Sequence, residues 1–231
     1  MKEFESEPAA AALLAEQVET YKRDGYIVIE DVLRGEELSM VQAAFDRAQA
    51  VTRIEWEKGR ASGVGISENG EYYASGTFHG RKYFDIYPLH LLEQDDACVE
   101  MIAHPRLFPF LSATVGEDVQ TATIQVRVLE PQTEEDAREE GGYVDWHRDH
   151  RNDEAWRHMG RPLNTKVIVY LTDVGPDDGC TCCVPGSHLF EHVPNSNGYK
   201  GMGGGDTQTT KVLDQRDMPG MVMAEAKAGS A

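Results

Sequence analysis

The sequence predicts a mainly β fold, a jelly roll with α-helices packed on its outside. Apolar residues recur at helical spacing in the first half, whereas short β-branched runs with glycine and proline turns follow Gly116. No glycine-rich loop follows a strand and opens a helix, which disfavours nucleotide-binding α/β folds. We expect one domain over residues 1–231, mostly helical with one early strand over 1–115 and a jelly-roll core over 116–231.

The first half supplies the expected helices. Leucine, valine and tyrosine at a 3.6-residue period predict a helix over residues 9–22, which Asp24-Gly25 ends. A short buried strand at residues 26–29 and a second helix from Leu38 to about Lys58 should follow. Residues 59–76 are rich in glycine, serine and asparagine without a period, and we expect a loop there.

The second half supplies the expected strands. Residues 99–115 still have helical spacing, broken at His104-Pro105, where the proline should start a new helix. Gly175-Pro-Asp-Asp-Gly179 predicts a turn, because glycine and proline both favour turn geometry. Strands are expected at residues 120–129, 166–171 and 180–184.

Composition excludes several classes of function. The formal charge of −18 argues against binding to nucleic acid or to anionic membrane. No apolar run approaches the roughly 20 residues of a membrane span, and the N-terminus lacks the apolar core of a signal peptide. We therefore expect a cytoplasmic protein with no nucleic-acid or membrane partner, and an oligomeric state that the sequence leaves open.

The four cysteines do not form a zinc-binding pattern. Three of them crowd into Cys180-Thr-Cys182-Cys183, and Cys98 is remote in sequence. We expect small buried thiols, with a redox or adventitious metal role as the alternative.

The densest polar cluster is Asp145-Trp-His-Arg-Asp-His150. On a strand, His147 and Asp149 project from the same face, so both can reach one metal ion. With a second histidine they would form the facial triad of non-haem Fe(II) oxygenases, which leaves metal positions open. Two alternatives are a solvated strand end, and a helix on which His147 and His150 pair.

Several segments, in order, resemble the phytanoyl-CoA dioxygenase-like family. Trp146-His147-Arg148-Asp149 is similar to the family's Trp-His-x-Asp metal motif. Residues 167–188, which end in Pro-Gly-Ser-His188, are similar to the family's strand–turn–strand segment. The segment Tyr21-Lys-Arg-Asp-Gly-Tyr and the step His104-Pro105 also agree.

The resemblance implies a cupin-like double-stranded β-helix, Fe(II) bound by His147 and Asp149, and 2-oxoglutarate and O2 as cosubstrates. It implies hydroxylation of a small organic molecule while 2-oxoglutarate is decarboxylated to succinate. Some relatives replace the carboxylate with alanine or glycine and bind halide instead, so Asp149 favours hydroxylation over chlorination.

The family pattern breaks at the C-terminus. The family has a second iron histidine, and an arginine that pairs with the far carboxylate of 2-oxoglutarate. We expect both after Ala231, so the last jelly-roll strands should be missing from this chain. His188 or His192 is the alternative third ligand, and a shortened inactive relative is another reading.

Three further residues are candidates for the cosubstrate pocket. Gln125 and Arg127 share one face of the strand that enters the metal motif, and relatives often line the pocket there. Lys166 opens the next long strand and could approach an acidic cosubstrate. For each, a solvated strand residue is the alternative.

Two rival functions remain. A non-catalytic relative would bind a small molecule in the same pocket without forming succinate. A metal-dependent enzyme of the cupin type would be indifferent to 2-oxoglutarate.

Overall fold

The computed structural model describes residues 7–57, 63–66, 72–78, 81–87, 96–121, 126–129, 158–162, 164–176, 178–189 and 220–231. The helices are α1 (Glu7–Asp24), α2 (Gly35–Glu57), α4 (Asp96–Ile102) and α5 (Phe108–Val115), with a short 3-10 helix η1 (Ser187–Leu189). The strands are β1 (Gly63–Ile66), β2 (Tyr72–Phe78), β3 (Arg81–Tyr87), β4 (Val126–Leu129), β5 (Cys182–Cys183) and β6 (Val222–Met223).

Both long N-terminal helices form where the apolar period predicts them. Helix α1 ends at the expected glycine: Gly25 adopts φ +80° and its N–H donates to the carbonyl of Tyr21 at 2.8 Å. Helix α2 ends close to the expected position, at Glu57. These helices are therefore readable from the sequence to within a few residues.

Strands β1 to β4 form an antiparallel sheet in the order β1-β2-β3-β4. The expectation of a loop over residues 59–76 is wrong in part, since β1 and the first part of β2 lie there. The expectation of a single strand within residues 1–115 is also wrong, because β1, β2 and β3 all lie there. The glycines in these strands weaken the local signal, and pairing with β3 overrides it. Strand β4 confirms the end of the strand expected at residues 120–129.

The break at His104-Pro105 is confirmed, but the new helix does not start at that proline. Residues 105–107 form a turn, and α5 begins at Phe108 with Pro109 in its first turn. A proline is tolerated there because the first helical N–H groups have no partner within the helix.

The C-terminal segment, residues 226–231, lies between two extended segments far away in the sequence. On one side Ile29 and Ala231 exchange N–H···O bonds of 2.7 and 3.0 Å, and the Leu33 N–H donates to Gly229 at 2.9 Å. On the other side the Tyr170 N–H donates to Ser230 at 2.9 Å, and Val174 pairs with Ala226. The segments expected as strands at 26–29 and 166–171 are thus extended. Each is joined to the C-terminal segment by separate hydrogen bonds and not by a regular ladder.

The expected turn and the strand after it are partly confirmed. The Asp178 N–H donates to the Gly175 carbonyl, and the Asp178 carboxylate accepts the Gly175 N–H at 2.9 Å. Only β5 of the expected strand 180–184 is regular, and it pairs with β6.

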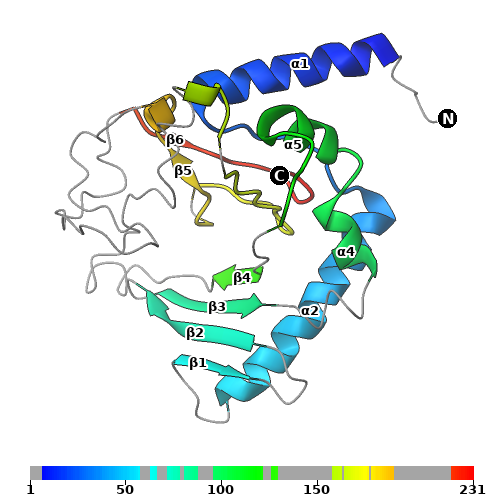
Figure 1. Cartoon of the computed structure of the whole chain (residues 1–231). Coiled ribbons are helices and arrows are strands. Elements are labelled where there is room, and N and C mark those ends of the chain that lie inside the picture. The colour runs from blue at the N-terminus through cyan, green and yellow to red at the C-terminus, as the bar shows by residue number, and fades with distance from the viewer. Residues whose placement is uncertain are drawn as a thin grey trace.

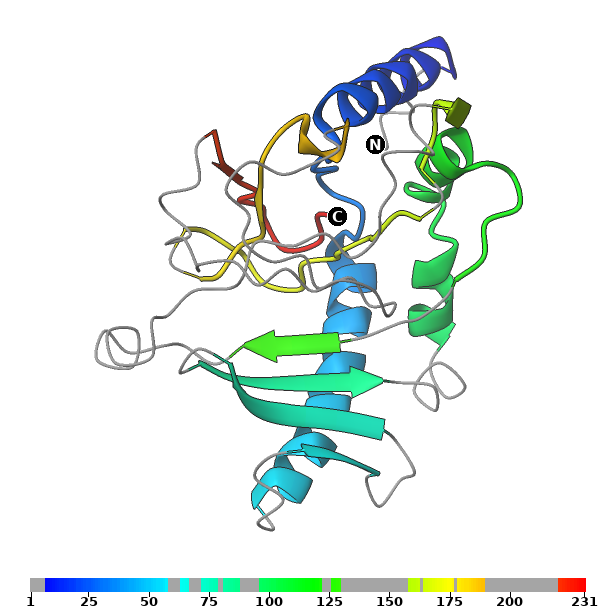
Figure 2. The same cartoon turned by 60° about the vertical axis from the view of Figure 1, so that its left-hand side comes forward.

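Two apolar clusters hold these parts together. One cluster joins α2 to the segment 169–171: Leu33, Val41, Ala44 and Phe45, with Leu38, Met101, Val169 and Leu171 against them. The other joins α1 and α5 across the segment 27–32: Val18, Tyr21, Ile29, Val32, Leu107, Phe110 and Leu111. Figures 1 and 2 show α2 running from these clusters to the four-stranded sheet at the other end of the molecule. Among the described residues, no helix is long and apolar enough to cross a membrane.

Candidate functional site

The expected metal ligands lie in a part of the chain that the structure does not describe. His147, Asp149 and Gln125 are outside the described residues, whereas Arg127 and Lys166 are inside them. Within the described segments, no three His, Cys, Asp or Glu side chains are grouped so that they could hold a metal ion. The metal site therefore stays a prediction.

Lys166 lies in an extended segment whose alternate residues face the helices. The Thr165 hydroxyl is 3.0 Å from the Tyr21 hydroxyl of α1, and Val169 and Leu171 pack against the α2 cluster. Successive side chains of an extended strand project to opposite faces. By this alternation Lys166, Ile168 and Tyr170 lie on the other side of the segment from Thr165, Val169 and Leu171.

This second face carries an unusual combination of side chains. Ile168 is 41% exposed, and Lys166 is exposed beside it. Tyr170 is fixed at the far end: its hydroxyl lies 3.1 Å from the Thr181 hydroxyl and accepts the Thr181 N–H at 3.1 Å. We call Lys166, Ile168 and Tyr170 the open face of this segment.

Arg127 lies in a different part of the β structure. It stands on β4, opposite Asp85 of β3 in the register, and its side chain is exposed while that of Val128 is half-buried. Arg127 is therefore on the more open side of the four-stranded sheet. Lys166 instead belongs to the segment beside the C-terminal residues, so the structure describes the two candidates in separate places.

His104 is not available as a metal ligand. It is 2% exposed, its Nε2–H donates to Glu37 Oε1 at 2.6 Å, and its Nδ1 accepts the Arg106 N–H at 3.3 Å. Arg106 also pairs with Glu37 and donates from Nε to the Val32 carbonyl at 2.7 Å. Burial raises the pKa of Glu37, but the hydrogen bond from His104 and the charges of His104 and Arg106 outweigh it and hold that pKa below its usual value.

His188 has a structural contact that competes with metal binding. Its Nε2–H donates to the Lys22 carbonyl at the end of α1 at 3.0 Å, and its ring lies against Gly25. The neighbouring Gly186 N–H donates to the Asp24 carbonyl at 2.8 Å. The Asp-Gly turn and the Pro-Gly-Ser-His turn, which appear as separate motifs in the sequence, are packed on each other.

The thiols of the cysteine cluster have the character expected of buried side chains. Cys180 is buried, Cys182 and Cys183 are half-buried, and none of the three is in a disulfide. Burial, with a smaller effect from Cys182, raises the pKa of Cys183 to about 11. Burial also raises the pKa of Cys180. Protonated thiols are poor nucleophiles, so the structure favours packing over reactivity at Cys180 and Cys183.

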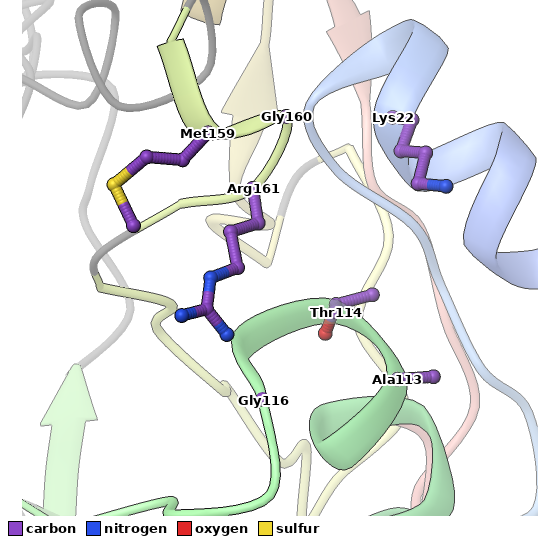
Figure 3. A pocket seen from close by; sticks show the side chains of 7 residues that line it. All are labelled: Lys22, Ala113, Thr114, Gly116, Met159, Gly160 and Arg161. Carbon is purple, nitrogen blue, oxygen red and sulfur yellow. The ribbon is translucent and has the colours of Figure 1, made fainter.

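A surface depression of about 210 Å³ lies between the ends of α1 and α5. Figure 3 shows the seven residues that line it: Lys22, Ala113, Thr114, Gly116, Met159, Gly160 and Arg161. Its two cations already have partners, since Lys22 bonds Glu19 at 3.1 Å and Arg161 donates to the Val115 carbonyl at 2.9 Å. Neither of the two described candidates, Arg127 and Lys166, lines this depression.

The sequence pattern does not tell the two sides of the segment around Lys166 apart. The run Lys166-Val-Ile-Val-Tyr-Leu171 is apolar on both faces, so the pattern alone does not tell which face packs on helices. The contact between Thr165 and Tyr21 supplies that information.

Comparisons with known proteins find relatives over most of the chain. The chain is 23% identical over 227 aligned residues to the ectoine dioxygenase of Nocardia farcinica (strain IFM 10152), covering 94% of this chain and 68% of that protein. Two crystal structures of the epimerase SnoN are also similar, each 19% identical over 95% of this chain. One, in complex with Fe³⁺, alpha ketoglutarate and nogalamycin RO, has a TM-score of 0.49 with 73% of its chain covered. The other, described as the non-heme alpha ketoglutarate dependent epimerase from nogalamycin biosynthesis, has a TM-score of 0.43 with 70% covered.

The family comparison covers most of the chain. Residues 21–231 match the family described as phytanoyl-CoA dioxygenase (PhyH), whose enzymes use Fe(II), 2-oxoglutarate and O2. The match includes the Trp146-His147-Arg148-Asp149 segment, both packed turns and the open face. The chain belongs to the phytanoyl-CoA dioxygenase family.

Proposed function

We propose that this chain is a non-haem Fe(II)/2-oxoglutarate-dependent dioxygenase that hydroxylates a small organic molecule and converts 2-oxoglutarate to succinate. The observation that carries the proposal is the family match over residues 21–231, which includes an intact His-x-Asp pair at His147 and Asp149. That pair supplies one imidazole nitrogen and one carboxylate oxygen, the donor set of the facial-triad iron sites.

His147 and Asp149 have distinct roles in this proposal. Both would hold iron, and the bound metal supplies the activation of O2 that side chains alone do not provide. Asp149 also occupies the position that a halide would need, so the expected product is an alcohol.

In this proposal, cationic and polar side chains hold the cosubstrate. 2-Oxoglutarate carries two carboxylates at neutral pH, and in a protein of net charge −18 they require local cations. Lys166 would supply one such charge. Gln125 and Arg127 are proposed as pocket residues from the family pattern alone, because β4, which carries Arg127, belongs to the separate four-stranded sheet.

The third iron ligand in this proposal is another histidine. Of the histidines whose contacts the structure describes, His104 is hydrogen-bonded on both ring nitrogens and His188 Nε2 bonds the Lys22 carbonyl. We propose that the third histidine, and the arginine for the far carboxylate of 2-oxoglutarate, follow Ala231 in the family pattern.

The substrate is proposed only as a class. The similar protein from Nocardia farcinica is described as an ectoine dioxygenase, so ectoine and related amino-acid derivatives are the first compounds to test.

The deciding experiment is an anaerobic titration of Fe(II) with 2-oxoglutarate, followed by the iron-to-oxoacid charge-transfer band. It should be run on the 231-residue chain and on a form extended past Ala231, with His147→Ala in each as control. A band only in the extended form supports the third ligand as proposed. A band in the 231-residue chain would place that ligand at a histidine within it. Absence of the band and of succinate from both forms would favour the non-catalytic relative.

A further inference from the structure

We infer that Cys180, Cys182 and Met223 form a binding site for a soft monovalent metal ion, namely Cu(I). The inference goes beyond the proposed dioxygenase function, because its donors are three sulfur atoms and include none of the expected iron ligands. Its basis is the pairing of β5 with β6, which brings a methionine opposite a pair of thiols.

The register of β5 and β6 places the three sulfur-bearing residues on one face of this two-stranded sheet. Cys182 pairs directly with Met223. The pairing continues one residue further, where the Ala224 N–H donates to the Thr181 carbonyl at 2.8 Å. Figure 1 shows the two strands side by side. Because alternate residues of a strand share a face, and directly opposed residues share it too, Cys180 lies on the same face as Cys182 and Met223.

The contacts of the two thiols agree with this placement. The Cys182 thiol donates to the Cys180 carbonyl at 3.8 Å, and the side chains of Cys180 and Cys182 are hydrogen-bonded to each other. Glu225, two residues beyond Met223 on the neighbouring chain segment, acts on the Cys180 thiol through its charge. Thiol S–H groups are weak donors, so a metal ion that replaces their protons displaces little hydrogen-bond energy.

Cys183 belongs to the opposite face and provides a matched control. Its partner in the register is Val222. Burial first, and then the charge of the Cys183 thiolate, raise the pKa of Tyr26, so these two side chains lie near each other. Thr181 shares that face and is bonded to the Tyr170 hydroxyl. Cys183→Ser therefore changes a thiol next to the proposed ligands without removing a sulfur atom from their face.

The types of donor atom select the class of ion. Thiolate and thioether sulfurs are soft ligands that favour Cu(I), whereas Mg²⁺, Ca²⁺ and Mn²⁺ prefer oxygen ligands. Structural zinc takes four ligands from cysteine, histidine and carboxylate side chains. Within the described part of the chain, no group of even three such side chains could hold a metal ion. Two thiolates with one thioether therefore suit Cu(I) better than zinc.

Burial and protonation determine how the ion would bind. Cys180 is buried, whereas Cys182 and Met223 are half-buried, so an ion can enter beside Cys182 and is shielded from water at Cys180. Binding replaces both thiol protons: two R–SH groups and one Cu(I) give one Cu(S–R)2 anion and two protons, with no change of oxidation state. Since burial raises the pKa of the Cys180 thiol, the apparent affinity for Cu(I) should rise with pH.

The test is anaerobic competition for Cu(I) between the 231-residue chain and the chromophoric chelator bicinchoninate, with urea unfolding of each variant measured alongside. Wild type should bind one Cu(I) per chain. Cys180→Ser and Cys182→Ser should each weaken binding by more than about 100-fold, which exceeds the usual effect of losing an outer partner of a ligand. Met223→Leu should weaken binding about tenfold, because a neutral thioether is a weaker donor than a thiolate. Cys183→Ser should bind Cu(I) as the wild type does.

X-ray absorption of the Cu(I)-loaded chain gives a second measurement that does not depend on affinity. Three sulfur neighbours in wild type and two in Met223→Leu support the inference, and this variant remains informative if a serine variant unfolds. Equal weakening in Cys183→Ser and Cys182→Ser, or tighter binding of Zn(II) than of Cu(I), would overturn it. Loss of Cu(I) binding in His147→Ala would also overturn it, because the ion would then lie at the expected iron site.

Discussion

The contact between Gly25 and His188 gives the sharpest test of the fold. A Cβ on Gly25 would lie 2.3 Å from His188 Nδ1, 2.5 Å from its Cγ and 3.0 Å from its Cβ. Gly25→Ala therefore displaces the whole His188 side chain, because the close atoms include Cβ and Cγ as well as Nδ1. The displaced ring loses the bond from Nε2 to the Lys22 carbonyl, which joins the Pro-Gly-Ser-His turn to α1.

The expected loss of stability has two parts. Alanine at φ +80° costs about 1 kcal/mol in backbone strain. Loss of the His188 hydrogen bond and its packing adds about 1–2 kcal/mol. Gly220 is the matched control, because its φ is +75° and a Cβ added there would meet no atom within 4 Å among the described residues. Gly220→Ala should cost only the backbone part.

The assay is urea unfolding of both alanine variants, each in the wild-type and His188→Ala backgrounds. Gly25→Ala should cost about 1–2 kcal/mol more than Gly220→Ala in wild type, and nearly the same when His188 is alanine. Equal costs in the wild-type background would refute the steric argument. Fully additive effects of Gly25→Ala and His188→Ala would refute the coupling between the two turns.

The remaining predictions concern the buried network, the metal ligands and the thiols. Because the folded pKa of Glu37 is depressed, its contribution to stability is present above its unfolded pKa and is lost as the pH falls through the folded value. Urea midpoints of Glu37→Gln should therefore lie below wild type at neutral pH and converge with it in acid, and a constant gap would contradict this. His147→Ala should abolish tight Fe(II) binding, measured by anaerobic metal titration. Asp149→Gly should abolish hydroxylation, measured by product analysis. Unchanged Fe(II) affinity in the first variant, or unchanged hydroxylation in the second, would show that the residue is not an iron ligand. With a pKa of about 11, Cys183 should react with iodoacetamide at neutral pH far more slowly in the native chain than in urea. Labelling is measured by mass spectrometry, and rapid labelling of the native chain would count against the burial of Cys183.

The parts of the fold that could be predicted from the sequence are those determined by local pattern. Helix α1 places Val18 and Tyr21 on one buried face, and its end at Gly25 follows from the conformational freedom of glycine. The break before α5 follows from proline. Strands β1 and β2 could not be predicted, because they contain several glycines and owe their form to pairing with β3.

The site divides in the same way. The His147-x-Asp149 pair can be recognised in the sequence because its residue types and their spacing are typical of a metal-binding motif. The choice between the two faces of Lys166-Val-Ile-Val-Tyr-Leu171 depends on where α1 and α2 pack. The role of His188 likewise depends on a backbone carbonyl 166 residues away in sequence, at Lys22. Such long-range contacts leave no local trace in a single sequence.

The hydrogen bonds between residues 29–33 and residues 229–231 impose an order of events during synthesis. The two partners are separated by roughly 200 residues, so at ribosomal speed the first waits roughly 10 to 40 s for the second. During that interval the N–H groups of Ile29 and Leu33 have none of their native partners, and an extended edge of this kind invites pairing with other nascent chains. Lower growth temperatures or chaperone co-expression should therefore raise the soluble yield more than any change near the metal site.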